Sequence, residues 1–237
     1  MRAPAEDGFH LLTVVMPVFN EERYIRRAVE RMLAVELPIP FELVIVDDGS
    51  TDGSRAAVED LLDDRRVRWV ANPRNLGKGA AIHTGIDEAR GDLLTVLDAD
   101  LEYDPADYVG LLKAVLDDDA RVVYGKRGLG AHTAYSFWYV LGNRSVNLWA
   151  SFLNNAWVTD VETCFKMAET QIWRSLGLRS KGFGIEAEAT GQFLRSGYRI
   201  HEVPISYRAR TRGEGKKLRW TDGVEALLIL LRVRLGR

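Results

Sequence analysis

The chain has 237 residues, with 32 Lys and Arg against 34 Asp and Glu and a formal net charge of -2. Apolar residues make up 46% and charged residues 28%, which excludes a disordered or collagen-like chain. The near-neutral charge argues against a nucleic-acid partner, and a single cysteine, Cys164, excludes a disulfide framework or a zinc site of several thiolates. No apolar run reaches the roughly 20 residues of a transmembrane helix, and the first ten residues lack a signal-peptide core, so we expect a soluble chain facing the cytoplasm.

Strands alternate with helices through the first half of the chain. LLTVVM is a short β-rich run ended by Pro17, and apolar residues then recur at helical spacing from Tyr24 to Leu33. The pattern continues with predicted strands at 41–48, 67–71, 92–100 and 121–125, and helices at 54–62, 80–89 and 103–116. The second half is less regular, and its predicted elements are a helix at 183–195, a strand at 198–205 and a helix that runs to the C-terminus.

This alternation predicts an α/β fold with a mainly parallel central sheet flanked by helices. Sheets of this kind bind ligands at the carboxyl ends of their strands. Four strings of polar residues each follow a predicted strand: PVFNE (17–21), DDGS (47–50), NPRNLGKG (72–79) and DAD (98–100). We therefore expect these strings to meet at one edge of the sheet.

The sharpest of these strings is Asp98-Ala99-Asp100, followed by Glu102. Carboxylates two residues apart at the exit of a strand can reach one hard cation, and Mg²⁺ or Mn²⁺ favours oxygen ligands together with a diphosphate. A metal held there would offset charge on a departing nucleoside diphosphate. The alternative is a solvated acidic turn in which Asp104 caps the following helix.

The other strand-end strings are less specific. Asp48 can bond a base or a ribose hydroxyl, but Asp-Gly-Ser is also ordinary turn chemistry. Phe19 can lie against a base and Glu21 can accept from it, although Asn20 acting as a helix cap explains the string equally well. The Gly-Lys-Gly at 77–79 lacks the spacing of a phosphate loop, which favours close packing of a helix on the sheet.

Two features of the second half indicate an anionic or lipid partner. Five cations lie within ten residues, at Arg208, Arg210, Arg212, Lys216 and Lys217, which suits a diphosphate or anionic headgroups better than a solvated surface. The apolar C-terminal segment with its arginines, and the aromatic segment 135–157, suit a bilayer interface. Packing of the C-terminal segment onto the domain as a core helix is an equal alternative.

Taken together, PVFNE, VDDGS, NLGKGAA and DAD with Glu102 resemble the nucleotide-sugar transferases of glycosyltransferase family 2, which have the Rossmann-like GT-A fold. The strings YGKR, DVETCFKM, FGIEAEAT, EVPISY and RTRGEGKKLRWTDG are similar to the dolichyl-phosphate mannose synthase branch. The resemblance implies a single domain over 1–237. Its parts would be a nucleotide-sugar-binding half (1–127), an acceptor-side half with the basic loop (128–217) and an amphipathic C-terminal helix (218–237).

The resemblance also implies roles for single residues. Pro17, Phe19, Glu21 and Asp48 would hold the nucleotide, and Asp98, Ala99 and Asp100 the nucleotide sugar. Asp98, Asp100 and Glu102 would hold Mg²⁺ or Mn²⁺, and Arg127, Arg210 and Lys216 would grip phosphate. The residues expected to act in catalysis are Asp98, Asp100, Arg127 and Asp160. Phe19 stands where the family has tyrosine, and Lys126 where it has a small residue.

The activity implied is inverting, metal-dependent transfer of one hexose from a nucleotide sugar of the GDP-mannose or UDP-glucose type to a polyprenyl or dolichyl phosphate. The basic loop and C-terminal helix would place the enzyme peripherally on the cytoplasmic face of a membrane. The alternative is a soluble family 2 enzyme acting on a hydroxyl, which needs a carboxylate base, and the candidates are Asp160, Glu162, Glu186 and Glu188. A non-catalytic nucleotide-binding protein and a dinucleotide-dependent oxidoreductase are weaker alternatives, the latter because the glycine fingerprint is absent.

Overall fold

The computed structural model describes residues 8–128, 137–209 and 220–236. In these residues seven strands form one sheet in the order β3-β2-β1-β4-β6-β5-β7. Every described strand except β6 runs parallel, and β6 is antiparallel to both its neighbours. The predicted α/β fold with a mainly parallel sheet is therefore confirmed. The strands are β1 (Leu12–Val18), β2 (Phe41–Asp47), β3 (Val67–Ala71), β4 (Leu93–Val96), β5 (Val122–Arg127), β6 (Lys166–Glu169) and β7 (Ile200–Ile205).

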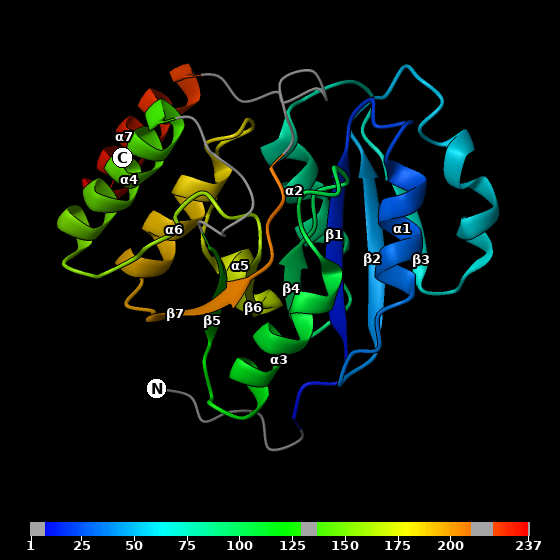
Figure 1. Cartoon of the computed structure of the whole chain (residues 1–237), viewed down its shortest axis with the longest axis horizontal. Helices are drawn as coiled ribbons and strands as arrows, with labels where there is room; N and C mark the ends of the chain where they lie inside the picture. Colours follow the sequence, from blue (N-terminus) through cyan, green and yellow to red (C-terminus); the bar gives the residue numbers. More distant parts are fainter. Residues whose placement is uncertain (1–7, 129–136, 210–219, 237) are drawn as a thin grey trace.

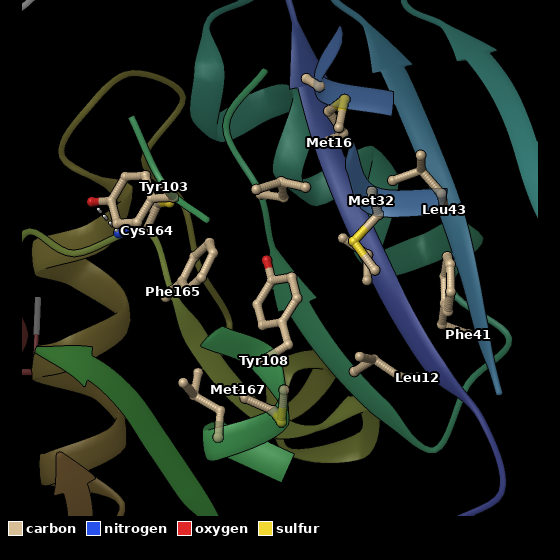
Figure 2. Close-up of a cluster of buried hydrophobic side chains, with 14 of the residues drawn as sticks. Leu12, Met16, Met32, Phe41, Leu43, Tyr103, Tyr108, Cys164, Phe165 and Met167 are labelled. Carbon is tan, nitrogen blue, oxygen red and sulfur yellow. Dashed lines mark hydrogen bonds between the residues drawn. The ribbon is translucent and has the colours of Figure 1, made fainter. Parts of the chain in front are cut away.

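Helices cover both faces of the sheet (Figure 1). Alternate side chains of a strand point to opposite faces, so Leu12 and Met16 of β1 enter one core cluster and Val15 enters the other. Figure 2 shows the first cluster, in which Met32 and Tyr108 pack beside β1. The first face carries α1 (Ile25–Leu33) and α3 (Tyr108–Leu116), and the second carries α2 (Lys78–Glu88), α5 (Thr170–Ser175) and α6 (Ile185–Arg195).

Two further helices, α4 (Phe137–Asn154) and α7 (Trp220–Arg234), pack on α6 at the end of the molecule away from β3 (Figure 1). Their shared core includes Val146, Ala187 and Leu230, and Trp149 Nε1 donates to the Leu227 carbonyl at 3.1 Å. The predicted C-terminal helix therefore does pack on the domain. Within the described residues, none of the helices combines the length and apolar character needed to cross a membrane.

Some predicted boundaries were wrong. Pro17 does not end the first strand but pairs in register with Val46 inside it. The Val15 carbonyl accepts from Leu97 N, so the backbone groups of Val15 face β4. Pro17 is two residues further along and its nitrogen faces the same side, but β4 has already ended at Val96. The missing N–H of Pro17 therefore removes no hydrogen bond between the two strands. The segment predicted as a helix at 54–62 is a 3₁₀ helix, Ala56–Asp63. Another 3₁₀ turn, Pro105–Asp107, precedes α3, with Asp104 Oδ1 accepting from Ala106 N as the predicted cap.

Candidate active site

A cavity of about 260 Å³ opens beside the carboxyl ends of β1, β2 and β4. The site residues predicted from the strand-end strings line it, as expected for loops that leave the same edge of a parallel sheet, and so does Arg127, which the family resemblance implied. These residues are Pro17, Phe19, Glu21, Asp48, Asp98, Ala99, Asp100, Glu102 and Arg127. Arg210 and Lys216 lie outside the described residues.

The loops that follow β1 and β2 are locked together on the nucleotide side predicted for this cavity. Asn20, with a left-handed φ of 53°, accepts from Thr51 N at 2.8 Å through its side chain. Its own N–H donates to Ser50 Oγ at 3.0 Å, and Glu21 N donates to Ser54 Oγ at 2.9 Å. These bonds hold the PVFNE loop rigidly at the rim of the cavity.

Asp48 is buried and holds the loop that leads into α2. Its carboxylate accepts from the Asn72 side chain at 2.8 Å, from Leu76 N at 3.1 Å and from Gly77 N at 2.7 Å. Buried carboxylates need such donors. The nucleotide-binding role predicted for Asp48 stays a prediction, and its visible contacts shape the loop that presents Lys78.

Lys78 bridges two carboxylates inside the cavity. Its ammonium lies 2.9 Å from Asp98 Oδ2 and 2.7 Å from Glu186 Oε1. Burial alone would lower the pKa of Lys78, but the charges of Asp98 and Glu186 outweigh it and raise that pKa well above its ordinary value. Asp98 thus has a cationic partner of its own, supplied by the first residue of α2.

Glu102 is hydrogen-bonded to the segment that follows β7. Its Oε2 accepts from the Tyr207 hydroxyl at 2.6 Å, and its backbone carbonyl accepts from Arg208 N at 2.8 Å. Leu101, just before it, has a left-handed φ of 64°, which turns the chain away from β4 between Asp100 and Glu102. The acid loop and the segment leading to the basic loop are therefore joined at Glu102.

The acids fit a divalent metal only in combination with a diphosphate. Among the described residues, no three His, Cys, Asp or Glu side chains are grouped so that they could hold a metal ion. Mg²⁺ and similar ions are commonly bound by one or two carboxylates plus substrate phosphates and water. Asp98 and Asp100, both facing the cavity, fit that arrangement; Oε2 of Glu102 accepts from the Tyr207 hydroxyl, and its predicted role as a metal ligand stays a prediction.

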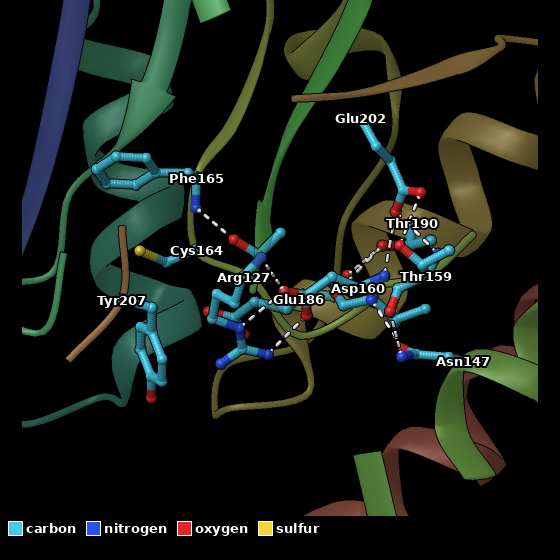
Figure 3. A network of polar contacts seen from close by, with 12 residues as sticks. Arg127, Asn147, Thr159, Asp160, Cys164, Phe165, Glu186, Thr190, Glu202 and Tyr207 are labelled. Carbon is cyan, nitrogen blue, oxygen red and sulfur yellow. Dashed lines mark hydrogen bonds and ion pairs between the residues drawn. The ribbon is translucent and has the colours of Figure 1, made fainter. Parts of the chain in front are cut away.

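Arg127 is held at the cavity by a buried network (Figure 3). Its Nε and Nη2 donate to Asp160 Oδ2 and Oδ1 at 2.8 and 2.6 Å, and its backbone N–H donates to Oδ2 at 2.9 Å. Asp160 N and Thr159 in turn donate to Glu202. The catalytic role predicted for Asp160 stays a prediction, and its contacts are those of a residue that positions Arg127.

A second cavity of about 300 Å³ adjoins the first and shares Arg127 and Tyr207 with it. Lys126 and Arg144 also line it, together with Asp160, so its lining has three cations against one acid. Asn143, on the same wall, has a buried Oδ1 that finds no hydrogen-bond partner among the described residues. Arg127 therefore stands between an acidic cavity and a basic one.

A comparison with models of protein families shows to which family the chain belongs. Residues 13–167, which carry β2 to β5 and the acids Asp48, Asp98 and Asp100, match the family model for glycosyl transferase family 2. The chain belongs to this family. The resemblance of the strand-end strings is thereby confirmed over the segment that builds most of the cavity.

Curated relatives within family 2 match it over different lengths. Dodecaprenyl-phosphate galacturonate synthase of Rhizobium johnstonii is 37% identical over 120 residues, 49% of this chain and 36% of that protein. Undecaprenyl-phosphate 4-deoxy-4-formamido-L-arabinose transferase of Pseudomonas fluorescens is 30% identical over 213 residues, 87% of this chain and 60% of that protein. The chain thus spans less than two thirds of the length of either relative. Both relatives are named for a polyprenyl phosphate, in line with the branch that the second half resembles.

Solved structures also match the chain in fold. Glucosyl-3-phosphoglycerate synthase from Mycobacterium tuberculosis, bound to Mn²⁺, UDP and glucosyl-3-phosphoglycerate, matches with a TM-score of 0.73 over 96% of this chain and 80% of that one, at 21% identity. Another structure of that enzyme, with Mg²⁺ and UDP, gives a TM-score of 0.70 at the same identity. At this level of identity the likeness shows the fold, and the expected GT-A fold is confirmed.

The sequence reasoning missed several residues of the cavity, notably Lys78, Phe183, Tyr207 and Asp222. The signal for Lys78 was present in NLGKGAA, where close packing was favoured. Gly77 and Gly79 do pack against the 180–182 backbone, and this places Lys78 in the cavity. Glu162 and Glu186, considered only as bases for a hydroxyl acceptor, also line it.

Proposed function

We propose that this family 2 chain transfers a single sugar, with inversion, from a nucleoside-diphosphate sugar to a polyprenyl phosphate. The observation that carries the proposal is the pair of adjoining cavities, one lined by strand-end carboxylates and one by cations, with Arg127 shared between them. The names of the relatives support the polyprenyl phosphate. The donor is a hexose nucleotide of the GDP-mannose or UDP-glucose type.

On the donor side, Pro17, Phe19 and Glu21 hold the nucleoside at the rim, and Asp98 and Asp100 face the diphosphate. Bound Mg²⁺ or Mn²⁺ would supply Lewis-acid stabilisation of the departing diphosphate. Arg127, fixed by Asp160, adds a preorganised positive charge that needs no rearrangement when negative charge develops. The acids of the loop thus recruit the cation, and the arginine stabilises the phosphates.

On the acceptor side, the second cavity suits a phosphate. Lys126, Arg127 and Arg144 provide the positive charge, and Asp160, the acid on the same lining, is already paired with Arg127. A phosphate monoester is anionic near pH 7, so it attacks without a strong general base. The contribution of the protein is then orientation opposite the leaving diphosphate. Arg210 and Lys216 remain proposed phosphate contacts from the basic loop.

The α4–α7 pair provides a surface for the membrane in which such an acceptor resides. Large apolar side chains are exposed along it, with Phe152 and Trp157 each 77% exposed. On α4, Leu148 and Phe152 lie four residues apart and so share one stripe, as do Val224 and Leu228 on α7, and the exposed Leu235 follows the end of α7. Exposed arginines accompany them (Arg144, Arg232 and Arg234) and complement anionic lipid. We place the enzyme peripherally on the cytoplasmic face of a membrane.

A donor screen tests the proposal. Purified chain is incubated with a short polyprenyl phosphate, Mg²⁺ or Mn²⁺, and each of several GDP and UDP sugars, and lipid products are read by mass. We expect one donor to give a glycosyl phosphate lipid, with loss of product after EDTA and in Asp98→Ala and Asp100→Ala. Full product formation after metal removal contradicts the metal role. Absence of any lipid product across the screen contradicts the acceptor.

A hydroxyl acceptor is the second candidate, favoured by Glu162. This carboxylate lines the donor cavity, and burial raises its pKa despite the opposing charge of Arg127. A carboxylate with a raised pKa suits general-base catalysis. Of the other acids considered for this role, Glu188 accepts from Arg179 N and Ser180 N, and Glu186 pairs with Lys78. Sugar appearing in a water-soluble product, with loss in Glu162→Gln, would favour this candidate.

A further inference from the structure

We infer that the Lys78 ammonium competes with the divalent metal for Asp98. It keeps the metal from Asp98 until a diphosphate binds and pairs with the ammonium instead. This inference rests on the proposed function, because it takes Asp98 as a metal ligand. Lys78 is then a positioning residue that makes metal binding depend on the donor. The consequence is cooperative binding of metal and nucleotide.

The backbone that carries Lys78 cannot shift freely. Gly77 has a φ of 103°, and a Cβ at this position would lie 2.4 Å from the Lys181 carbonyl oxygen. A Cβ at Gly79 would lie 2.3 Å from the Ser180 carbonyl oxygen, and Ala80 N donates to Lys181 O at 3.1 Å. The start of α2 is therefore docked on the loop before α6, so any movement of the ammonium must come from the side chain.

Two acids from distant parts of the chain meet at that ammonium. Asp98 follows β4, whereas Glu186 lies in the first turn of α6. Lys78 contacts one oxygen of each, and the three side chains are only 15%, 21% and 10% exposed for Lys78, Asp98 and Glu186. The ammonium cancels part of a negative charge that would otherwise be nearly buried.

A divalent cation that binds Asp98 must either share this carboxylate with the Lys78 ammonium or displace the ammonium. If it binds while Lys78 stays, two positive charges lie within a few ångströms in a poorly screened site. If Lys78 leaves Asp98, it needs another anion, since an unpaired ammonium is costly in such surroundings. A diphosphate supplies that anion, because Lys is a mobile point charge on a flexible stem that readily pairs with phosphate.

Binding of metal and nucleotide should therefore be coupled through Lys78. By linkage, each ligand raises the affinity of the other by the same factor, commonly about 5- to 150-fold for coupled sites. Removal of Lys78 should strengthen metal binding in the absence of nucleotide. It should weaken the coupling without removing the phosphate ligands that the nucleotide itself offers the metal.

The test measures Mn²⁺ binding by the signal of free Mn²⁺ in electron paramagnetic resonance, with and without UDP or GDP and with correction for Mn²⁺ held by free nucleotide. Lys78→Met is compared with wild type and with Lys181→Met, which removes an exposed charge from the neighbouring loop. We expect Lys78→Met to bind Mn²⁺ alone at least about fivefold more tightly than wild type, with the enhancement by nucleotide reduced by the same factor. Lys181→Met should behave as wild type.

A second variant guards against loss of folding. Lys78→Met with Glu186→Gln removes one charge of each sign and should still bind Mn²⁺ alone more tightly than wild type, with a smaller gain than Lys78→Met because one nearby negative charge is also lost. An unchanged or lower affinity for Mn²⁺ alone in both variants overturns the inference, as does an equal gain in Lys181→Met. If wild type binds Mn²⁺ and transfers sugar while the variants show no gain, only this inference fails. If wild type binds no Mn²⁺ with any nucleotide, the metal role in the proposed function fails with it.

Discussion

Arg127 and Asp160 form a two-point ion pair in which each carboxylate oxygen receives one guanidinium nitrogen, at 2.8 and 2.6 Å. Their side chains are only 9% and 5% exposed. The Tyr207 ring lies against the guanidinium, 5.0 Å from its centroid to Arg127 Cζ. The arginine shared by the two cavities is thus fixed from two sides.

Loss of Asp160 should destabilise the fold as well as the site. Asp160→Ala leaves a buried guanidinium without its partner, and we expect the free energy of unfolding to fall by about 3–5 kcal/mol in urea titrations. Arg121→Ala is a matched control, because its pair with Glu169 is much more exposed, at 47% and 27%, and should contribute less than about 1 kcal/mol. Equal urea midpoints for the two variants would contradict a structural role for the Arg127–Asp160 pair.

Arg127→Lys separates charge from geometry at the same position. Lysine keeps the positive charge but cannot make the two-point contact with Asp160. Loss of one charge-assisted hydrogen bond is worth about 1.5–3 kcal/mol, so we expect kcat/KM for sugar transfer to fall roughly 10- to 100-fold. The measurement is initial rate at varied donor and acceptor, and wild-type kinetics in Arg127→Lys would show that charge alone suffices.

Glu102 and Tyr207 provide a test of the metal ligands. Because Glu102 accepts from the Tyr207 hydroxyl at 2.6 Å, Glu102→Gln and Tyr207→Phe should each lower the free energy of unfolding by about 1–2 kcal/mol. The double variant should lose little more than either single one, as expected for two partners of one contact. Mn²⁺ affinity should stay within about twofold of wild type in both single variants. A loss of more than about tenfold in Glu102→Gln alone would show that Glu102 is a metal ligand, as the sequence predicts.

The edge of the sheet that carries the cavity could be predicted because the information is local. Runs such as LLTVVM and FELVIV identify buried parallel strands, and such strands bring their following loops to one edge. Pro17, Asp48 and Asp98 could thus be placed together from the sequence alone.

The side-chain pairs that fix Arg127 and Glu102 could not be predicted, because each pair joins segments that are distant in the sequence. Asp160 and Arg127 are 33 positions apart in the sequence, and Tyr207 and Glu102 are 105 positions apart. β6 was also missed, because it is only four residues long and begins with a buried lysine rather than an apolar residue. Sequence periodicity does not record contacts of this kind.

That lysine, Lys166, is the basis of a prediction about pH. Its ammonium donates to the backbone carbonyls of Val161 and Thr163, and it is 2% exposed. Burial lowers its pKa to about 8, against the opposing charges of Glu186 and Asp160. Below pH 8 the lysine is charged in the folded and unfolded chain alike, and the full cost of burying the charge is present.

As pH rises through about 8, Lys166 loses its proton in the folded chain. In the unfolded chain it keeps the proton up to its ordinary pKa of 10.5. The cost of burial therefore declines, and wild type should gain up to about 3 kcal/mol relative to Lys166→Met between pH about 8 and about 10. Urea titrations across that range measure the difference. Lys113→Met, at an exposed position of α3, should track wild type, and a flat difference for Lys166→Met would contradict the lowered pKa.

The α4–α7 surface should govern binding to lipid. Phe152→Ser with Trp157→Ser removes two aromatic side chains that are 77% exposed. Burying a large apolar side chain is worth about 1.5–3 kcal/mol, so partial insertion of both should make the loss in affinity for anionic vesicles at least about tenfold in sedimentation. The matched control is Val109→Ser with Leu116→Ser, at exposed positions of α3, which lies away from α4 and α7 (Figure 1). Equal binding by both double variants would contradict this surface, whereas loss confined to the aromatic pair would identify it as the part of the molecule that enters the bilayer interface.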